Sequence, residues 1–217
     1  MRIFFSFKII TIIVVLSQAL LFCHLINAQG TTNAVNPKPV DYSYLHEAQI
    51  ISFYGENNIY PKSGDFSYTF GARLDFNSDI IGFYYKFGIG ANPEGNMCGH
   101  LPLGLEAGIG LGLLAYYNGN YLLLLPAIIC AIIPEGITAK FWQRDKYNLK
   151  FYLSPWGSEI NLYKEDAYSL VSGECGIQGS IFAHKSISMS CYAGAKTLYK
   201  GFRPAVTMGA TVGFVLD

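Results

Sequence analysis

Hydrophobic and polar residues alternate position by position over long parts of this chain. From Phe66 to Phe76 apolar side chains occupy every second position, and between them lie Ser67, Thr69, Gly71, Arg73 and Asp75. Successive side chains of a β-strand point to opposite faces, so a period of two predicts a strand with one apolar and one polar face. The run has the length of roughly 9–11 residues that a tilted membrane strand needs.

Further strands are predicted downstream, separated by short polar turns. They cover residues 81–89, 147–153, 168–183, 187–195 and 206–216. In most of them apolar residues alternate with glycine or polar residues. This pattern predicts that one face of the sheet contacts lipid and that the other face lines an interior.

The segment from Leu101 to Ile133 contains a single charged residue, Glu106. From Leu103 to Tyr117 it also has a period of two, and the Asn118-Gly119 pair that follows is a strong hairpin signal. We therefore predict two membrane strands joined by a tight turn. The second of them, Tyr121 to Phe141, is long and interrupted by prolines, so it contains a bulge or kink. If residues 134–136 form a turn instead, the chain has ten strands.

The predicted fold is all-β, a closed antiparallel up-and-down transmembrane β-barrel of eight strands, with ten as the alternative. Closure follows from the membrane environment, because unpaired backbone groups at an open sheet edge are costly in lipid. An even number of antiparallel strands closes such a barrel without a free edge.

The N-terminal part of the chain has a different character. Residues 1–28 combine a basic start, an apolar core and a small residue at Ala28, which predicts a cleaved secretory signal peptide. An uncleaved anchor helix and a lipoprotein modified at Cys23 are the alternatives. Residues 29–65 are interpreted as an N-terminal leader, partly disordered, with a short strand at 48–54 or a segment that packs against the barrel. The barrel itself is assigned to residues 66–217.

Composition supports a membrane barrel and argues against a protein that binds nucleic acid. Aromatic residues make up 15% of the chain, charged residues only 14%, and there are 23 glycines. Without Arg2 and Lys8, 13 of the 15 basic residues remain against 15 acidic ones, so the exported chain carries about −2 and has no basic run for nucleic acid. The cysteines have no metal-ligand spacing. Cys175 and Cys191 are interpreted as lipid-facing residues, with a disulfide as the alternative.

Three features resemble the small outer-membrane β-barrel proteins of Bacteroidetes-type bacteria. They are the Ala28-Gln29 end of the leader, the hairpin at residues 117–120 and the final strand from Arg203 to Phe214. The resemblance covers roughly residues 66–217. It implies a barrel in the outer membrane of a Gram-negative bacterium, with outer-membrane lipid and the barrel-assembly machinery as partners. It implies no particular activity.

Charged residues on the polar faces are predicted to form a network inside the barrel. They are Arg73, Asp75, Lys86, Glu106, Lys140, Lys150, Glu174 and Lys196. An eight-stranded barrel is only wide enough to be filled by its own side chains. The network is therefore interpreted as an internal plug of ion pairs, with a proton or solute path as the alternative.

An apolar cluster in the second half of the Leu101–Ile133 segment is a candidate site for a hydrophobic ligand. It comprises Leu122, Leu124, Ile128 and Ile132, which would make part of the lumen apolar if they point inward. Simple packing or a contact on the outer surface is the alternative.

The sequence predicts no catalytic residue, cofactor or metal. His184-Lys185-Ser186 resembles the His-x-Ser pair of outer-membrane barrels that remove acyl chains from lipid A, although Ile187-Ser188 follows in place of that motif's asparagine-bearing continuation. The resemblance implies histidine as the base and serine as the nucleophile of a lipid-modifying enzyme, which is a further alternative. The predicted function is a structural, adhesive or binding barrel with an extracellular partner. A carrier or small channel for a hydrophobic ligand is the alternative.

Overall fold

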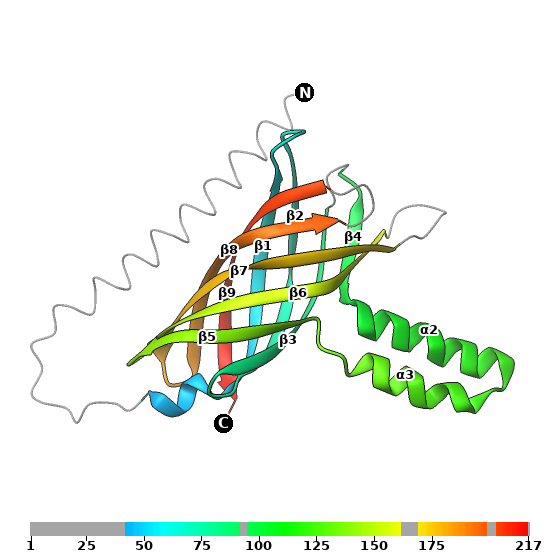
Figure 1. Cartoon of the computed structure of the whole chain (residues 1–217), viewed down its shortest axis with the longest axis horizontal. Helices are drawn as coiled ribbons and strands as arrows, with labels where there is room; N and C mark the ends of the chain where they lie inside the picture. The colour runs from blue at the N-terminus through cyan, green and yellow to red at the C-terminus, as the bar shows by residue number, and fades with distance from the viewer. Residues whose placement is uncertain (1–41, 92–94, 162–168, 199–202, 217) are drawn as a thin grey trace, which may run out of the picture. The chain divides into compact units, whose positions relative to one another are not determined.

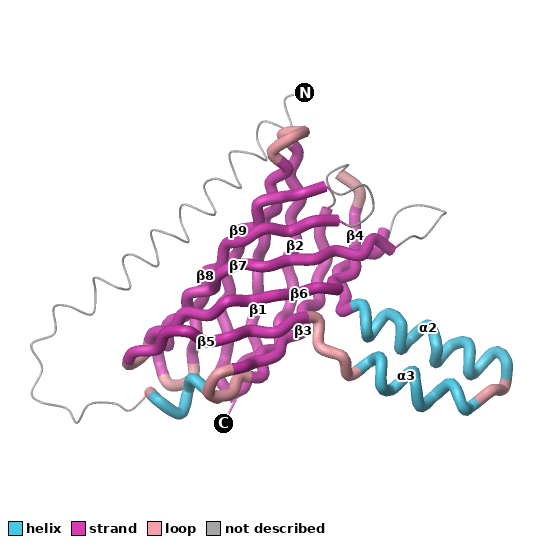
Figure 2. The backbone as a smooth tube through the Cα atoms, viewed as in Figure 1, coloured by secondary structure: helices cyan, strands magenta, loops and turns pink. Residues whose placement is uncertain are grey.

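The computed structural model describes residues 42–91, 95–161, 169–198 and 203–216 (Figure 1, Figure 2). The predicted signal peptide and the first part of the leader lie outside these residues. In the part of the chain that the structure describes, strands account for most residues, and they belong to one sheet.

The described strands and helices follow one another in chain order. The strands are β1 (Gln49–Tyr60), β2 (Asp65–Phe76), β3 (Ile81–Ala91), β4 (Met97–Pro102), β5 (Gly136–Arg144), β6 (Tyr147–Asn161), β7 (Ser169–His184), β8 (Ile187–Leu198) and β9 (Arg203–Leu216). The helices are η1 (Ser43–His46), α2 (Leu103–Asn118), η2 (Tyr121–Leu123) and α3 (Leu124–Ala131).

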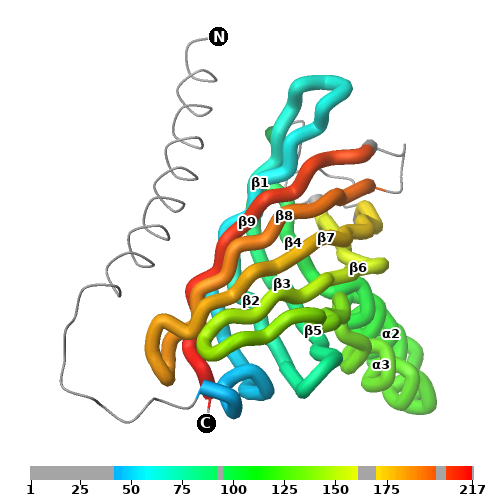
Figure 3. Tube along the Cα trace, turned by 60° about the vertical axis from the view of Figure 1, so that its left-hand side comes forward, coloured from blue at the N-terminus to red at the C-terminus, as the bar shows by residue number. Residues whose placement is uncertain are grey.

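The strands form a closed antiparallel barrel with eight positions in its wall. Strands that follow one another in the chain pair, except that β4 and β5 both pair with β3 and with β6, and the ring closes where β1 pairs with β9, as Figure 3 shows. At Gly55, for example, β1 has Phe70 of β2 on one side and Ala210 of β9 on the other. Nine strands fill eight positions because β4 and β5 share one of them. The predicted closed antiparallel barrel is confirmed.

The first strand of the barrel lies where we placed the leader. Residues 49–60 form β1, which pairs along its length with β2 and β9. The barrel therefore begins at Gln49, and the predicted boundary at residue 66 is wrong. The short strand predicted at 48–54 is part of β1, and its polar residues Ser52, Glu56 and Asn58 are buried inside the barrel, where polar side chains find partners.

The two faces of the wall have opposite character. Large apolar side chains such as Phe53, 68% exposed, cover the outside. Polar and charged side chains fill the inside, where Arg73 and Lys86 are each 2% exposed. A barrel that works in water has its apolar side chains inside. The observed arrangement is that of a transmembrane barrel, whose outer face meets lipid.

The Leu101–Ile133 segment is not the predicted pair of strands. Residues 103–118 form helix α2, and after the turn at Gly119 the chain returns through η2 and α3. Gly119 has a φ of 63° and ends α2 in the left-handed conformation, so the Asn-Gly pair serves as a helix end. None of the helices among the described residues has the length and apolar character to cross a bilayer.

Close packing explains why a glycine-rich segment forms a helix here. Gly104, Gly108 and Ala115 are the buried residues of α2. A Cβ atom on Gly104 would lie 2.5 Å from the carbonyl oxygen of Cys130, and one on Gly108 would lie 2.6 Å from that of Ala127. The glycines therefore let α3 approach closely. Alternating glycines, which suggested a strand, also produce this four-residue spacing along one face of a helix.

Candidate functional site: the interrupted wall and the lumen behind it

One position of the barrel wall is built from two short strands, and the helical hairpin is inserted between them (Figure 1). On β3, residues 88–91 pair with β4 and residues 81–84 pair with β5. On β6, residues 157–161 pair with β4 and residues 147–153, with one bulge, pair with β5. The segments 85–87 of β3 and 154–156 of β6 therefore face an interruption of the ladder.

The buried side chain of Glu135 closes this interruption from the inside. Its Oε2 accepts a hydrogen bond from the backbone N–H of Lys86 at 2.9 Å, a donor that an uninterrupted strand would satisfy. Its Oε1 lies 3.0 Å from Nε2 of His100. The hydroxyl of Ser154 donates to the backbone oxygen of Glu135 at 3.2 Å. One residue thus connects β3, β4 and β6 across the break.

Two aromatic side chains close the same interruption from the outside. The hydroxyl of Tyr85 donates to the carbonyl oxygen of Ile132 at 2.6 Å, and Nε1 of Trp156 donates to that of Pro134 at 2.9 Å. Both carbonyls lie in the link between α3 and β5, outside any helix or strand ladder that would pair them. On a surface that faces lipid such groups need protein donors, and these two side chains supply them.

The base of the hairpin also contacts the wall. Glu106, in the first turn of α2, accepts a hydrogen bond from the hydroxyl of the fully buried Ser158 on β6. We predicted Glu106 inside the lumen. The structure places it in a helix outside the wall, because the segment that carries it is not a strand.

Behind the interruption, a network of buried charges fills the lumen. Nζ of Lys86 lies 2.8 Å from carboxylate oxygens of both Glu56 and Glu174, and 4.0 Å from Oε1 of Glu135. Nζ of Lys196 lies 2.7 Å from Glu159 and 3.3 Å from Glu56. Each lysine has several carboxylate partners, which compensates for its removal from water.

Tyrosine side chains occupy the space beside these charges. Tyr84, Tyr152 and Tyr192 form one buried cluster. The rings of Tyr152 and Tyr192 meet edge to face at 5.7 Å, and the Tyr192 hydroxyl donates to Glu56 at 3.0 Å. The guanidinium of Arg73 lies 4.2 Å from the ring centre of Tyr84. Aromatic rings and ion-paired side chains are thus packed against each other in this part of the lumen.

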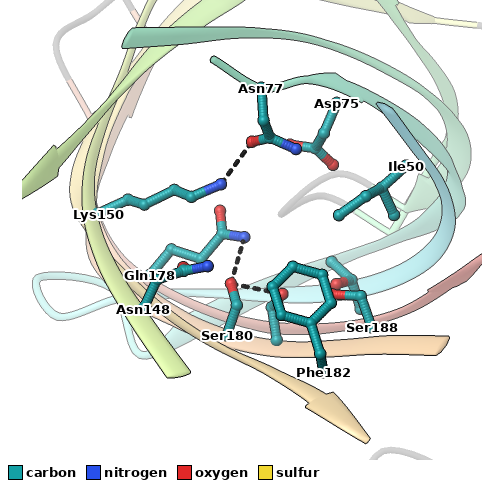
Figure 4. A pocket seen from close by; sticks show the side chains of 11 residues that line it. Ile50, Asp75, Asn77, Asn148, Lys150, Gln178, Ser180, Phe182 and Ser188 are labelled. Carbon is teal, nitrogen blue, oxygen red and sulfur yellow. Dashed lines mark hydrogen bonds between the residues drawn. The ribbon is translucent and has the colours of Figure 1, made fainter. Parts of the chain in front are cut away.

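A second cluster of polar side chains lies nearer the end of the barrel that contains the last residues of β9. Arg73 donates to Asp75 at 2.7 Å and to Gln178 at 2.9 Å, and Lys150 donates to the side chain of Asn77. Figure 4 shows Asp75, Asn77, Lys150 and Gln178 around a small polar cavity. The cavity has room for about one water molecule.

The segment before β1 covers this end of the barrel. Leu45 of η1 packs with Ile50, Phe182 and Val215 in a small apolar cluster. The neighbouring His46 is 1% exposed, lies 2.6 Å from the carbonyl oxygen of Asp145, and meets the Asn148 amide nitrogen through Nδ1 at 3.1 Å. These contacts define a neutral imidazole that donates from Nε2 and accepts at Nδ1.

The predicted lumen residues have different positions in the structure. Those whose side chains are buried in the barrel are Arg73, Asp75, Lys86, Lys150, Glu174 and Lys196. Lys140 lies near the covered end, where it donates to the backbone oxygen of His46 at 3.3 Å. Glu106 is outside the wall, as described above.

Four members of the network were missed by sequence reasoning. They are Glu56, His100, Glu135 and Glu159. Glu56 lies two positions from Asn58 and four from Ser52, on the polar face of β1, but we had assigned it to the leader, outside the barrel. Glu159 belongs to β6, which continues past Pro155 through a bulge. His100 and Glu135 flank an insertion, and no local pattern shows that their side chains meet.

The predicted hydrophobic-ligand residues do not face the lumen. Leu122, Leu124, Ile128 and Ile132 belong to the hairpin and are exposed, Leu122 to 85%. They are in a helical segment outside the wall, so they cannot form an apolar lumen. The alternative of a contact on the outer surface is the one compatible with this position.

The structure also places the other candidates from the sequence, which are the histidine–serine pair and two cysteines. Nδ1 of His184 accepts a hydrogen bond from the backbone N–H of Ser186 at 3.3 Å, so this contact does not involve the serine hydroxyl. Cys175 and Cys191 are both exposed free cysteines. In the register of β7 and β8, Cys175 lies opposite Ala195 and Cys191 opposite Gly179, so the two thiols are not adjacent.

Comparisons with known proteins find similarity in structure alone. Neither the models of protein families nor the characterised proteins that were compared match the sequence. Neisserial surface protein A has a TM-score of 0.46 and 8% identity, over 77% of this chain and 95% of that one. Ail, the attachment invasion locus protein of Yersinia pestis, has a TM-score of 0.44 and 11% identity, over 78% and 99%.

A third solved structure with a similar score is the N-terminal β-barrel domain of Pseudomonas aeruginosa OprF. It has a TM-score of 0.43 and 6% identity, over 78% of this chain and 98% of that domain.

Proposed function

We propose that this protein is an outer-membrane β-barrel, exported by the signal peptide at residues 1–28, that acts by binding or structural support and not by transport. The observation that carries the proposal is the filled lumen. Lys86 and Lys196 connect Glu56, Glu159 and Glu174 across the barrel interior. Its insertion would depend on the barrel-assembly machinery, and an extracellular partner would bind the connections between strands.

The membrane part of the proposal rests on the outer face of the wall. Burying one large apolar side chain is worth about 1.5–3 kcal/mol. Such side chains are exposed on strands around the ring, including Phe53, Phe70, Phe151, Ile177 and Phe214. In water they would make an unfavourable surface, whereas acyl chains would cover them. A closed ring also leaves no unpaired strand edge in lipid.

The transport part can be tested by conductance. The purified protein reconstituted in a planar lipid bilayer is expected to give no steady ionic current. Tyr192→Ala removes a buried ring beside the charge network and is expected to raise the leak of ions. Tyr192→Phe is the matched control, because it keeps the ring and loses one hydrogen bond to Glu56. Reproducible open-channel steps in the wild-type protein would contradict the proposal.

The location can be tested by separating the membranes of the producing bacterium. The protein is expected in the outer-membrane fraction, starting near Gln29. Recovery of the mature chain from the inner membrane or the soluble fraction would contradict it.

A further inference from the structure

The hairpin of α2 and α3 suggests a contact that the barrel alone does not require. We propose that this hairpin lies in the same bilayer as the barrel, with its base in the hydrocarbon layer and its tip at the lipid headgroups. Its partner is then lipid. This inference rests on the proposed function, because it needs a barrel that spans a membrane.

The base of the hairpin lies within the apolar band of the wall. It leaves the wall between β4 and β5, opposite residues 85–87 in the middle of β3. Phe83 on one side of this point and Ile89 on the other are both exposed on the outer face. Lipid that covers these two residues also surrounds the first turn of α2, and Figure 1 shows both helices extending sideways from the barrel.

The surface of the hairpin has no polar face. Residues 103–133 carry one charge, Glu106, which lies at the base and contacts Ser158. Exposed apolar side chains occur along the whole hairpin, and they include Ile109, Leu113, Leu114, Leu122, Leu124, Leu125, Ile128, Ile129 and Ile132. A helix on the surface of a water-soluble protein has a polar side, whereas a helix that is apolar all round is covered by protein or lipid.

The contact between the two helices is of the kind used in membranes. Gly104 and Gly108 are four residues apart and bring the backbone of α3 close, as the distances to Cys130 and Ala127 show. Helices in lipid gain little from burying apolar side chains against each other. They associate through small residues that allow close backbone approach.

The tip has the composition of a membrane–water interface. Tyr116, Tyr117 and Tyr121 are exposed, Tyr117 to 79%, and they surround Asn118 and Asn120. Tyrosine is enriched at the headgroup level of membranes. The asparagine amides also need polar partners, which headgroups and water supply.

The length of α2 allows the tip to reach this level. A helix of 16 residues is roughly 24 Å long. The apolar band of an outer-membrane barrel is about 25 Å tall, so the headgroups lie about half that distance from its middle. A helix that starts near mid-height and slants toward either surface therefore brings its tip to the interface.

Spin labels at single cysteines can measure this placement in the mature protein, from which cleavage of the signal peptide has removed Cys23. Cys98, Cys130, Cys175 and Cys191 are first replaced by alanine, and a label is then attached to Leu113→Cys, Ile128→Cys or Asn118→Cys. Val212→Cys, on the outer face of β9, is the control for insertion of the barrel. Accessibility to oxygen and to a water-soluble nickel chelate is recorded in phosphatidylcholine vesicles.

The expected result is a gradient of depth. Labels at 113 and 128 are accessible to oxygen and at least fivefold less accessible to the chelate than the label at 118. If label 212 reports lipid while labels 113 and 128 react with the chelate as strongly as label 118, the hairpin is in water and this inference is wrong. Labels at 113 and 128 that neither reagent reaches show a second copy or another protein on the hairpin, which also overturns it. If label 212 itself reports water, the proposed membrane barrel fails.

Discussion

The carboxylate of Glu135 accepts a hydrogen bond from the backbone N–H of Lys86 at 2.9 Å, and the same lysine extends its ammonium group to Glu56 and Glu174 at 2.8 Å. Lys86 thus belongs both to the interrupted wall and to the charge network of the lumen. This relationship allows an antiparallel barrel to accept a helical hairpin in its wall without leaving the buried N–H of Lys86 unpaired.

Removal of the Glu135 carboxylate is expected to destabilise the barrel. Glu135→Ala leaves the Lys86 N–H and His100 without their acceptor, and loss of one member of a buried charged group costs about 3–5 kcal/mol. Glu135→Gln keeps an acceptor oxygen and should lose less. The free energy of unfolding by urea in lipid vesicles measures both. Asp79→Asn, at an exposed turn, is the control, and an equal effect of all three substitutions would contradict this role.

Lys86 and Glu174 are expected to be energetically coupled. Lys86→Met leaves buried carboxylates without their shared cation, while the double variant with Glu174→Gln removes one of these carboxylates as well. The double variant should therefore be less destabilised than the sum of the single variants, by about 0.5–3 kcal/mol. The measurement is the free energy of unfolding of the wild type, Lys86→Met, Glu174→Gln and the double variant. Additive effects would show that the 2.8 Å contact contributes nothing to stability.

Two glycines of α2 should respond in opposite ways to alanine. At Gly108 a Cβ atom would lie 2.6 Å from the carbonyl oxygen of Ala127, whereas at Gly110 nothing lies within 4 Å. Gly108→Ala should force the helices apart at a cost of roughly 1–3 kcal/mol. Gly110→Ala should stabilise the helix by roughly 0.5–1 kcal/mol. Hydrogen exchange of the α2 and α3 amides in lipid reports both effects, and similar protection in the two variants would argue against close helix packing.

His46 should make stability depend on pH. Burial lowers the pKa of His46 below its ordinary value of 6.5, Lys140 and Lys150 act in the same direction, and the hydrogen bond to Asp145 opposes them. The folded protein thus keeps the imidazole neutral. As the pH falls below 6.5, the unfolded chain binds a proton more readily than the folded one, and the folded state loses stability.

The measurement compares the wild type with His46→Gln, which cannot titrate at this position. The stability advantage of the wild type should shrink as the pH is lowered from about 7.5 toward 5, and level off below the folded pKa. An advantage that stays constant over this range would mean that His46 is not buried in its neutral form.

Much of the barrel could be predicted from local pattern. The alternation in residues 66–76 and 81–89 correctly separates the outer face from the lumen, because side-chain direction in a strand depends only on position. Arg73, Lys86, Glu174 and Lys196 were placed in the lumen by the same rule, and the closed antiparallel fold followed from the cost of unpaired backbone groups in lipid. These features rest on interactions between a residue and its immediate surroundings, lipid or interior.

Other features depended on partners distant in the chain. The alternation in Leu103–Tyr117 is compatible with a strand, but β4 and β5 already fill that wall position, so these residues have no neighbouring strand to pair with. Gly104 and Gly108 instead meet α3, and a helix satisfies its own backbone groups. The sequence by itself determined which residues avoid water. Only the tertiary structure decided that Glu135 would meet His100 and Lys86, because closure of the ring brings β3, β4 and β6 together at one point.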